Sequence, residues 1–98
     1  MADLRFSWDP RKARANRDKH RVSFEEAQTV FFDEHAILID DPDASVAEER
    51  FLMLGLSAAL RLLTVCHCVR GGGDEIRIIS ARRADKFERR QYWERLAR

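Results

Sequence analysis

Residues 76–83, Ile76-Arg77-Ile78-Ile79-Ser80-Ala81-Arg82-Arg83, decide the fold of this chain. The mainly apolar run at residues 76–81 is typical of a buried β-strand. It continues through two arginines into residues 85–96, which predict a basic C-terminal helix. This junction of strand and helix is expected to bring several guanidinium groups and two aromatic side chains to one end of a sheet.

The residues before this strand predict its neighbour in the sheet. Gly71-Gly72-Gly73-Asp74 form a short, glycine-rich connection after an apolar segment at residues 60–70. Such a connection is typical of a hairpin turn, so the strands at 60–70 and 75–82 are expected to be antiparallel neighbours. A phosphate-binding loop is the less favoured alternative, because no nucleotide-binding fingerprint surrounds the glycines. Two further strands are expected at residues 36–40 and 50–56, with an acidic loop at residues 41–45 between them.

The N-terminal part predicts a short strand and a first helix. After a strand at residues 4–8 come Asp9, which can cap a helix, and Pro10, which suits its first turn. The helix should run to about Lys19. Its polar side chains at spacings of three and four predict one polar face. These are Lys12, Asn16, Lys19 and His20.

A second helix is predicted to begin at Ser23, because Ser23 and Glu26 have the spacing of a capping box. Its buried stripe is expected to consist of Phe24, Ala27, Val30 and Phe31. Together these patterns predict an α+β protein with two N-terminal helices, a mainly antiparallel sheet of four to five strands and a C-terminal helix.

Length and composition limit the class of protein. With 98 residues, 45% of them hydrophobic, the chain is expected to form a single domain over residues 1–98. No apolar run approaches the roughly 20 residues that span a bilayer, and the first residues lack a signal-peptide pattern, so a cytoplasmic location is expected. Cys66 and Cys68 share one face of a predicted strand, and we expect reduced, buried thiols rather than a disulfide or zinc site.

The formal net charge of +1 hides two basic ends. Residues 1–21 carry 7 Lys and Arg against 3 Asp and Glu, and residues 76–98 carry 8 against 3. The middle, residues 22–75, carries 3 against 11. Because the guanidinium fork of Arg fits phosphate and stays charged, adjacent basic ends would favour a polyanion, with RNA the first choice. Charge pairing between the segments is the alternative.

Short strings spread over nearly the whole chain jointly resemble one known family. They are Phe6-Ser7-Trp8-Asp9-Pro10 with Lys12 and Asn16, Lys19-His20, Val22-Ser23-Phe24-Glu25-Glu26-Ala27, Val30-Phe31-Phe32-Asp33, Glu48-Glu49-Arg50, Leu54-Gly55, and Ile76-Arg77-Ile78-Ile79-Ser80-Ala81-Arg82-Arg83-Ala84 before Glu88-Arg89-Arg90. In these strings the chain resembles the BrnT toxins of bacterial type II toxin-antitoxin modules, which have a RelE-like ribonuclease fold.

This resemblance implies RNA cleavage without a metal ion or other cofactor. It also implies neutralisation by a BrnA-like antitoxin, whose ribbon-helix-helix part binds operator DNA within a hetero-oligomer. The chain departs from the family at one place: Arg21 follows Lys19-His20 where glycine is usual. Because Arg is less favourable than Gly at a left-handed helix end, the first helix could end differently and aim His20 elsewhere.

Metal-free RNA cleavage requires a base, an acid and cationic donors for the phosphorane. The predicted catalytic residues are His20, Arg50, His67, Arg77 and Arg82, and the predicted RNA-binding residues are Lys12, Lys19, Arg83, Arg89, Arg90 and Trp93. Several of these residues have a plain structural alternative. His67 lies among apolar strand residues and could be a core side chain, and His20 could simply end its helix. Trp93 could serve equally to dock the antitoxin.

Two of the arginines raise a further question of geometry. Arg50 could pair with the acidic side chains of Glu48 and Glu49 instead of binding phosphate. By alternation along the strand, Arg77 and Arg82 should lie on opposite faces unless a bulge intervenes.

The preferred prediction is an endoribonuclease toxin that inhibits growth. The alternatives are a non-catalytic partner-binding module and an RNA-binding module without cleavage activity.

Overall fold

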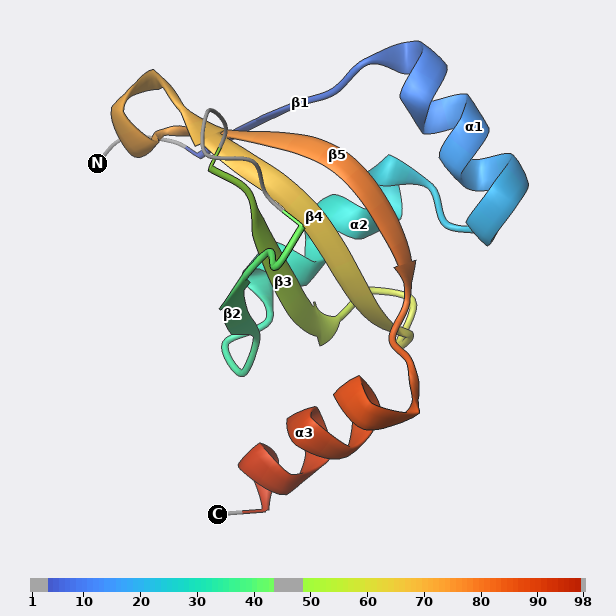
Figure 1. The fold of residues 1–98 in the computed structure, drawn as a ribbon, viewed down its shortest axis with the longest axis vertical. Helices are drawn as coiled ribbons and strands as arrows, with labels where there is room; N and C mark the ends of the chain where they lie inside the picture. Colours follow the sequence, from blue (N-terminus) through green and yellow to red (C-terminus); the bar gives the residue numbers. More distant parts are fainter. Residues whose placement is uncertain (1–3, 44–48, 98) are drawn as a thin grey trace.

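The computed structural model describes residues 4–43 and 49–97. It consists of a twisted five-stranded sheet with helices packed against it (Figure 1). In chain order the elements are β1 (Arg5–Ser7), α1 (Pro10–His20), α2 (Phe24–Thr29), the short 3₁₀ helix η1 (Val30–Phe32), β2 (Ile37–Asp40), β3 (Phe51–Leu56), β4 (Leu62–Arg70), the short 3₁₀ helix η2 (Gly71–Gly73), β5 (Glu75–Arg83) and α3 (Lys86–Leu96). The predicted α+β class and the predicted helices and strands are confirmed.

The strands lie in the order β1-β5-β4-β3-β2. β1 pairs with β5 in parallel, and the other pairs are antiparallel. The predicted hairpin between β4 and β5 is present, with Arg70 opposite Glu75. Its connection needs glycine because φ is 60° at Gly71, 71° at Gly72 and 107° at Gly73.

A β-bulge in β5 changes which side chains share a face. Cys66 pairs with Ser80 but the next residue, His67, pairs with Ile78, so Ile79 is left as the extra residue. Paired residues of antiparallel strands point to the same side. The alternation that predicted opposite faces for two arginines is therefore interrupted, and both lie on the same face. They are Arg77, opposite Cys68, and Arg82, opposite Thr64.

Different helices pack on the two faces of the sheet. The back face carries Leu63 and Val65, which pack with Phe24, Ala27 and Val30 beneath α1 and α2. The front face carries Thr64, Cys66 and Cys68 and is covered at one end by α3. There Tyr92 of α3 packs with Ile37, Leu54 and Leu62. In Figure 1, α3 lies at the lower end of the sheet.

Both cysteines of the front face are buried free thiols, as predicted. Burial, together with Asp41, whose Oδ2 lies 3.5 Å from Cys66 Sγ, raises the pKa of Cys66 to about 11. Cys66 therefore stays protonated at neutral pH. The helices of the described residues include none that is long and apolar enough to cross a membrane.

The predicted helix caps at Asp9 and Ser23 are present, but the complete capping box lies at the start of α3 and not at Ser23. Asp9 accepts a hydrogen bond from Arg11 N at 2.8 Å, and Ser23 Oγ accepts one from Glu26 N at 3.0 Å. The reciprocal half of the predicted capping box at Ser23 is absent, because the Glu26 carboxylate instead binds Arg61 and Ser57. A complete capping box occurs at the start of α3. It is formed by Asp85 and Glu88.

Arg21 does not alter the end of α1. It adopts the left-handed conformation, with φ 59° and ψ 33°, and its N–H donates to Arg17 O at 2.9 Å. This is the geometry in which glycine is preferred, and a residue with a Cβ costs roughly 1 kcal/mol there. The concern that Arg21 would end the helix differently is therefore not supported.

The predicted polar face of α1 is wrong at Asn16. Lys12 and Lys19 are exposed and His20 is half-buried, but Asn16 is only 7% exposed. Its amide Nδ2 donates to Val22 O and Ala81 O, and its Oδ1 accepts from Ala81 N. Asn16 thus fastens α1 to β5.

Candidate functional site

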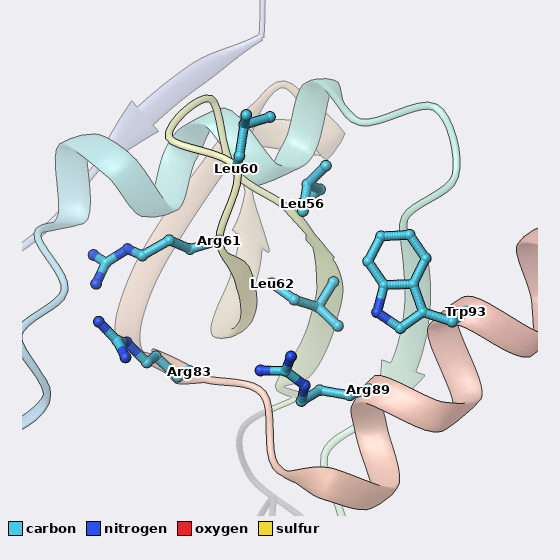
Figure 2. A pocket seen from close by; sticks show the side chains of 7 residues that line it. All are labelled: Leu56, Leu60, Arg61, Leu62, Arg83, Arg89 and Trp93. Atoms are coloured by element: carbon cyan, nitrogen blue, oxygen red, sulfur yellow. The ribbon is translucent and has the colours of Figure 1, made fainter.

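A pocket of about 230 Å³ lies where β4 begins, β5 ends and α3 passes the sheet (Figure 2). Three arginines, from the turn before β4, from β5 and from α3, surround it, and an indole closes one side. The apolar part of the wall comes from leucines. The lining residues are Arg61, Arg83, Arg89 and Trp93, with Leu56, Leu60 and Leu62. We call this the cationic pocket.

Arg61 is held rigidly in the pocket wall. Its Nε donates to Glu26 Oε2 at 2.9 Å, its Nη2 binds Glu26 Oε1, and Nη2 also donates to Arg21 O at 3.1 Å. Ser57 Oγ donates to the same Glu26 carboxylate at 2.7 Å. The hydrogen bond from Arg61 lowers the pKa of Glu26, with Ser57 adding to the effect. The bond to Arg21 O also ties the end of α1 to this wall of the pocket.

Arg83 and Arg89 differ from Arg61 because neither forms an ion pair within the described residues. Both are exposed. In Figure 2 the guanidinium groups of Arg61 and Arg83 extend in the same direction, and that of Arg89 projects from α3 toward the pocket. Two guanidinium groups without an ion-pair partner in the described residues, beside a fixed one, suit the oxygens of a phosphate.

Trp93 presents its indole on the other side of the pocket and is 48% exposed. It packs edge-on against Tyr92, with the ring centroids 5.0 Å apart. Tyr92 in turn donates to Asp33 Oδ2 at 2.6 Å, which anchors α3 to the sheet. The exposed indole is therefore held in a fixed position, and an unstacked base could lie on its face.

A second cleft lies on the front face and contains two of the predicted catalytic arginines, Arg50 and Arg82. Arg50 Nε lies 3.3 Å from Asp41 Oδ2, and Arg50 Nη2 donates to Asp43 O at 2.8 Å. The pairing of Arg50 with an acidic side chain is thus present, although its partner is Asp41; Glu48 lies outside the described residues. Asp41 and Asp43 give this cleft a negative wall, which is unfavourable for RNA.

Arg82 forms an ion pair with Glu88. Its Nη1 and Nη2 donate to the two carboxylate oxygens at 2.7 and 3.0 Å, and the same carboxylate accepts from Asp85 N at 2.9 Å. Although burial opposes it, the hydrogen bonds from Arg82 and Asp85 lower the pKa of Glu88. Arg82 thus ties the end of β5 to the first turn of α3.

We expect Arg82→Ala to lower the free energy of unfolding by about 2 kcal/mol. The Glu88 side chain is 11% exposed and would lose its cationic partner, whereas the 41% exposure of Arg82 limits the loss. Urea denaturation of Arg82→Ala, Glu88→Ala and the double variant would measure the coupling, expected to be about 1 kcal/mol. If the loss of stability in the double variant equalled the sum of the two single losses, a direct interaction between Arg82 and Glu88 would be contradicted.

The other predicted catalytic residues do not gather at one place. Arg77 lies toward the far end of β5 on the front face, and His20 lies at the end of α1. His67 is 1% exposed on the back face, where its ring packs edge-on against Phe31 at a centroid distance of 4.8 Å. This burial favours the core alternative for His67 over a catalytic role.

We expect His67→Phe to leave RNA cleavage within about twofold of the wild type and to change stability by less than about 1.5 kcal/mol at neutral pH. Burial lowers the pKa of His67 in the folded protein. As the pH falls through about 6.5, the unfolded chain takes up a proton that the folded one does not, so stability falls.

The variant should therefore lose less stability than the wild type as the pH falls below about 6.5, as measured by urea denaturation at each pH. At more acidic pH both proteins should lose further stability. The reason is that Glu26, Asp33 and Glu88 have lowered pKa values and must be protonated. A large loss of cleavage in a folded His67→Phe protein would restore the catalytic assignment.

Of the residues predicted to bind RNA, Arg83, Arg89 and Trp93 meet in the cationic pocket. The other three, Lys12, Lys19 and Arg90, are exposed on α1 and α3. Arg61 was not predicted from the sequence. The only signal for it was its charge, since it is one of three basic residues in the acidic middle of the chain. The residues that the structure describes include no group of three His, Cys, Asp or Glu side chains placed for a metal ion.

Residues 8–88 match the family model described as ribonuclease toxin, BrnT, of type II toxin-antitoxin system, and this match assigns the α+β fold to the class of ribonuclease toxins. The chain belongs to this BrnT family. Its fold is similar to the crystal structure of the Brucella abortus ribonuclease toxin BrnT, with a TM-score of 0.64 and 21% identity, over 85% of this chain and 99% of that one. No curated protein matched the sequence.

Proposed function

We propose that this toxin is an endoribonuclease that cleaves RNA at the cationic pocket without a metal ion. The observation that carries the proposal is the meeting of Arg61, Arg83 and Arg89 with the exposed indole of Trp93. Cations and an aromatic face in one small pocket match a nucleotide, which has a phosphate and a base. The charge that a metal ion could otherwise supply comes from the guanidinium groups.

In the proposed reaction the 2′-hydroxyl of one nucleotide attacks its own 3′-phosphate. The bond from phosphorus to the next 5′-oxygen breaks, and the products are a 2′,3′-cyclic phosphate and a 5′-hydroxyl. Arg83 and Arg89 stabilise the extra negative charge on the phosphorane, and Arg61 keeps the wall in place. His20, at the end of α1 that Arg61 holds, is proposed to transfer a proton. Arg50, Arg77 and Arg82 form an alternative set on the front face.

The proposed partner is a BrnA-like antitoxin with a ribbon-helix-helix part, in a hetero-oligomer that binds operator DNA in the cytoplasm. Membership of a type II toxin family supports an antitoxin partner. Exposed apolar side chains at the pocket rim, including Leu60 and Trp93, offer a protein surface that such a partner could cover.

The experiment that tests this function is induced expression followed by mapping of RNA ends. Wild-type protein should arrest growth and produce new cyclic-phosphate and 5′-hydroxyl ends, and the purified protein should cleave RNA in the presence of EDTA. Loss of cleavage with EDTA would contradict a metal-free reaction. Tight RNA binding without new ends would favour the RNA-binding module, and Arg77→Ala would report on the alternative arginine set.

A further inference from the structure

Two residues other than glycine have positive φ in the described part of the chain, and both belong to the surroundings of the cationic pocket. Arg21 has φ 59° at the end of α1, and Leu60 has φ 62° in the turn between β3 and β4. Leu60 lines the pocket. Arg21 is joined to it because its carbonyl accepts the hydrogen bond from Arg61.

In both places glycine would be the less strained residue. Arg21 occupies the position after a helix where left-handed glycine is usual. Leu60 follows a tight turn, in which Leu60 N donates to Ser57 O at 2.9 Å and Ser57 N donates to Arg61 O at 2.8 Å. A left-handed residue at this point of a hairpin is commonly glycine. Strain of this kind is found most often at functional sites.

The strained backbone presents both side chains to solvent. Leu60 is 78% exposed, and Arg21 is exposed as well. Neither burial nor an ion pair within the described residues therefore explains why Arg and Leu, and not glycine, stand at these two positions. The turn that carries Leu60 is also tied down, because Ala58 N donates to Thr29 Oγ1 at 2.8 Å. In Figure 2, Leu60 and Trp93 stand on different sides of the pocket, with Leu56 between them.

We propose that Arg21 and Leu60 are substrate-contacting residues that extend the cationic pocket for single-stranded RNA. Arg21 would bind a phosphate next to the one held by Arg61, Arg83 and Arg89. Leu60 would pack on the base that lies on Trp93. This inference rests on the proposed function of the pocket.

The test compares purified wild type, Arg21→Gly and Leu60→Gly for binding of a short fluorescein-labelled 2′-O-methyl RNA, which lacks the attacking hydroxyl. Because glycine relieves the strain, the melting temperature of either variant should stay the same or rise by up to about 4 °C. Affinity should nevertheless fall about fivefold in both. A variant that is more stable yet binds more weakly cannot be explained by damage to the fold.

The salt dependence separates the two contacts. The slope of log Kd against log salt should decrease by about 0.7 in Arg21→Gly, which loses a phosphate contact, and should not change in Leu60→Gly. Arg21→Lys should bind within about twofold of the wild type. Arg70→Ala is the charge-matched control, since Arg70 ends β4 about 26 Å from its pocket end.

Undiminished binding in both glycine variants, with binding by the wild type, would overturn this inference and leave the proposed function standing. A melting temperature clearly below that of the wild type would overturn it too, since the wild-type side chain would then have a structural role. Failure of the wild type to bind the RNA would remove the proposed function and this inference together.

Discussion

Replacing Asn16 with alanine is expected to lower the free energy of unfolding by about 3 kcal/mol. The Asn16 side chain is buried and makes three hydrogen bonds, at 2.8 to 3.0 Å, to the backbone of Ala81 and Val22. Alanine would leave these three buried backbone groups without that partner.

The position of Asn16 in the sheet explains the size of this effect. β1 pairs with β5 only from Glu75 to Arg77, so within residues 4–43 and 49–97 the outer edge of β5 has no strand partner at Ala81. The Asn16 amide binds both the N–H and the C=O of Ala81, as a neighbouring strand would. Buried backbone groups must be paired, and here a side chain replaces a strand.

Urea denaturation with linear extrapolation would measure this loss. Lys12→Ala, on the exposed side of the same helix, is the matched control and should change stability by less than about 0.5 kcal/mol. Asn16→Asp should also be strongly destabilising, because a carboxylate would face two carbonyl oxygens. A loss below about 1 kcal/mol in Asn16→Ala would mean that water replaces the amide.

The sequence predicted those parts of the fold that local chemistry determines. The apolar run of β5, the glycines of the hairpin and the cap at Asp9 each act through neighbouring residues, and all three are present. Asn16 was misplaced because its partners, Val22 and Ala81, are set by tertiary packing. Spacing along a helix shows which side chains share a face but does not show which face is buried.

The same limit applies to the site. Alternation predicted opposite faces for Arg77 and Arg82. The bulge at Ile79, which the sequence does not mark, places both side chains on the same face of the sheet. Arg61 was missed because its role depends on Glu26, which is 35 residues away in the chain. Two of the cationic residues predicted from the junction of β5 and α3, Arg83 and Arg89, line one pocket, whereas Arg82 pairs with Glu88.

Replacing both Arg83 and Arg89 with glutamine is expected to lower kcat/KM for RNA cleavage at least about 100-fold. Each guanidinium that binds the phosphorane through charge-assisted hydrogen bonds contributes about 1.5 to 3 kcal/mol, and the two together correspond to two or more orders of magnitude. The loss should lie mainly in kcat, because the charge on the phosphate oxygens increases in the transition state. Single-turnover cleavage of a labelled RNA would measure it.

The control is the double variant Arg70→Gln, Arg95→Gln, which removes the same charge from exposed positions that do not line the pocket. If general attraction for RNA were the whole role of these arginines, both double variants would raise KM alike and leave kcat unchanged. A contact to the reacting phosphate predicts a different result, because only the pocket variant should lose kcat. Neither Arg83 nor Arg89 forms an ion pair within the described residues, so both double variants should unfold at nearly the same urea concentration as the wild type. A fall in kcat without a fall in stability would therefore locate the reaction in the cationic pocket, whereas equal kinetics in the two variants would move it to the arginines of the front face.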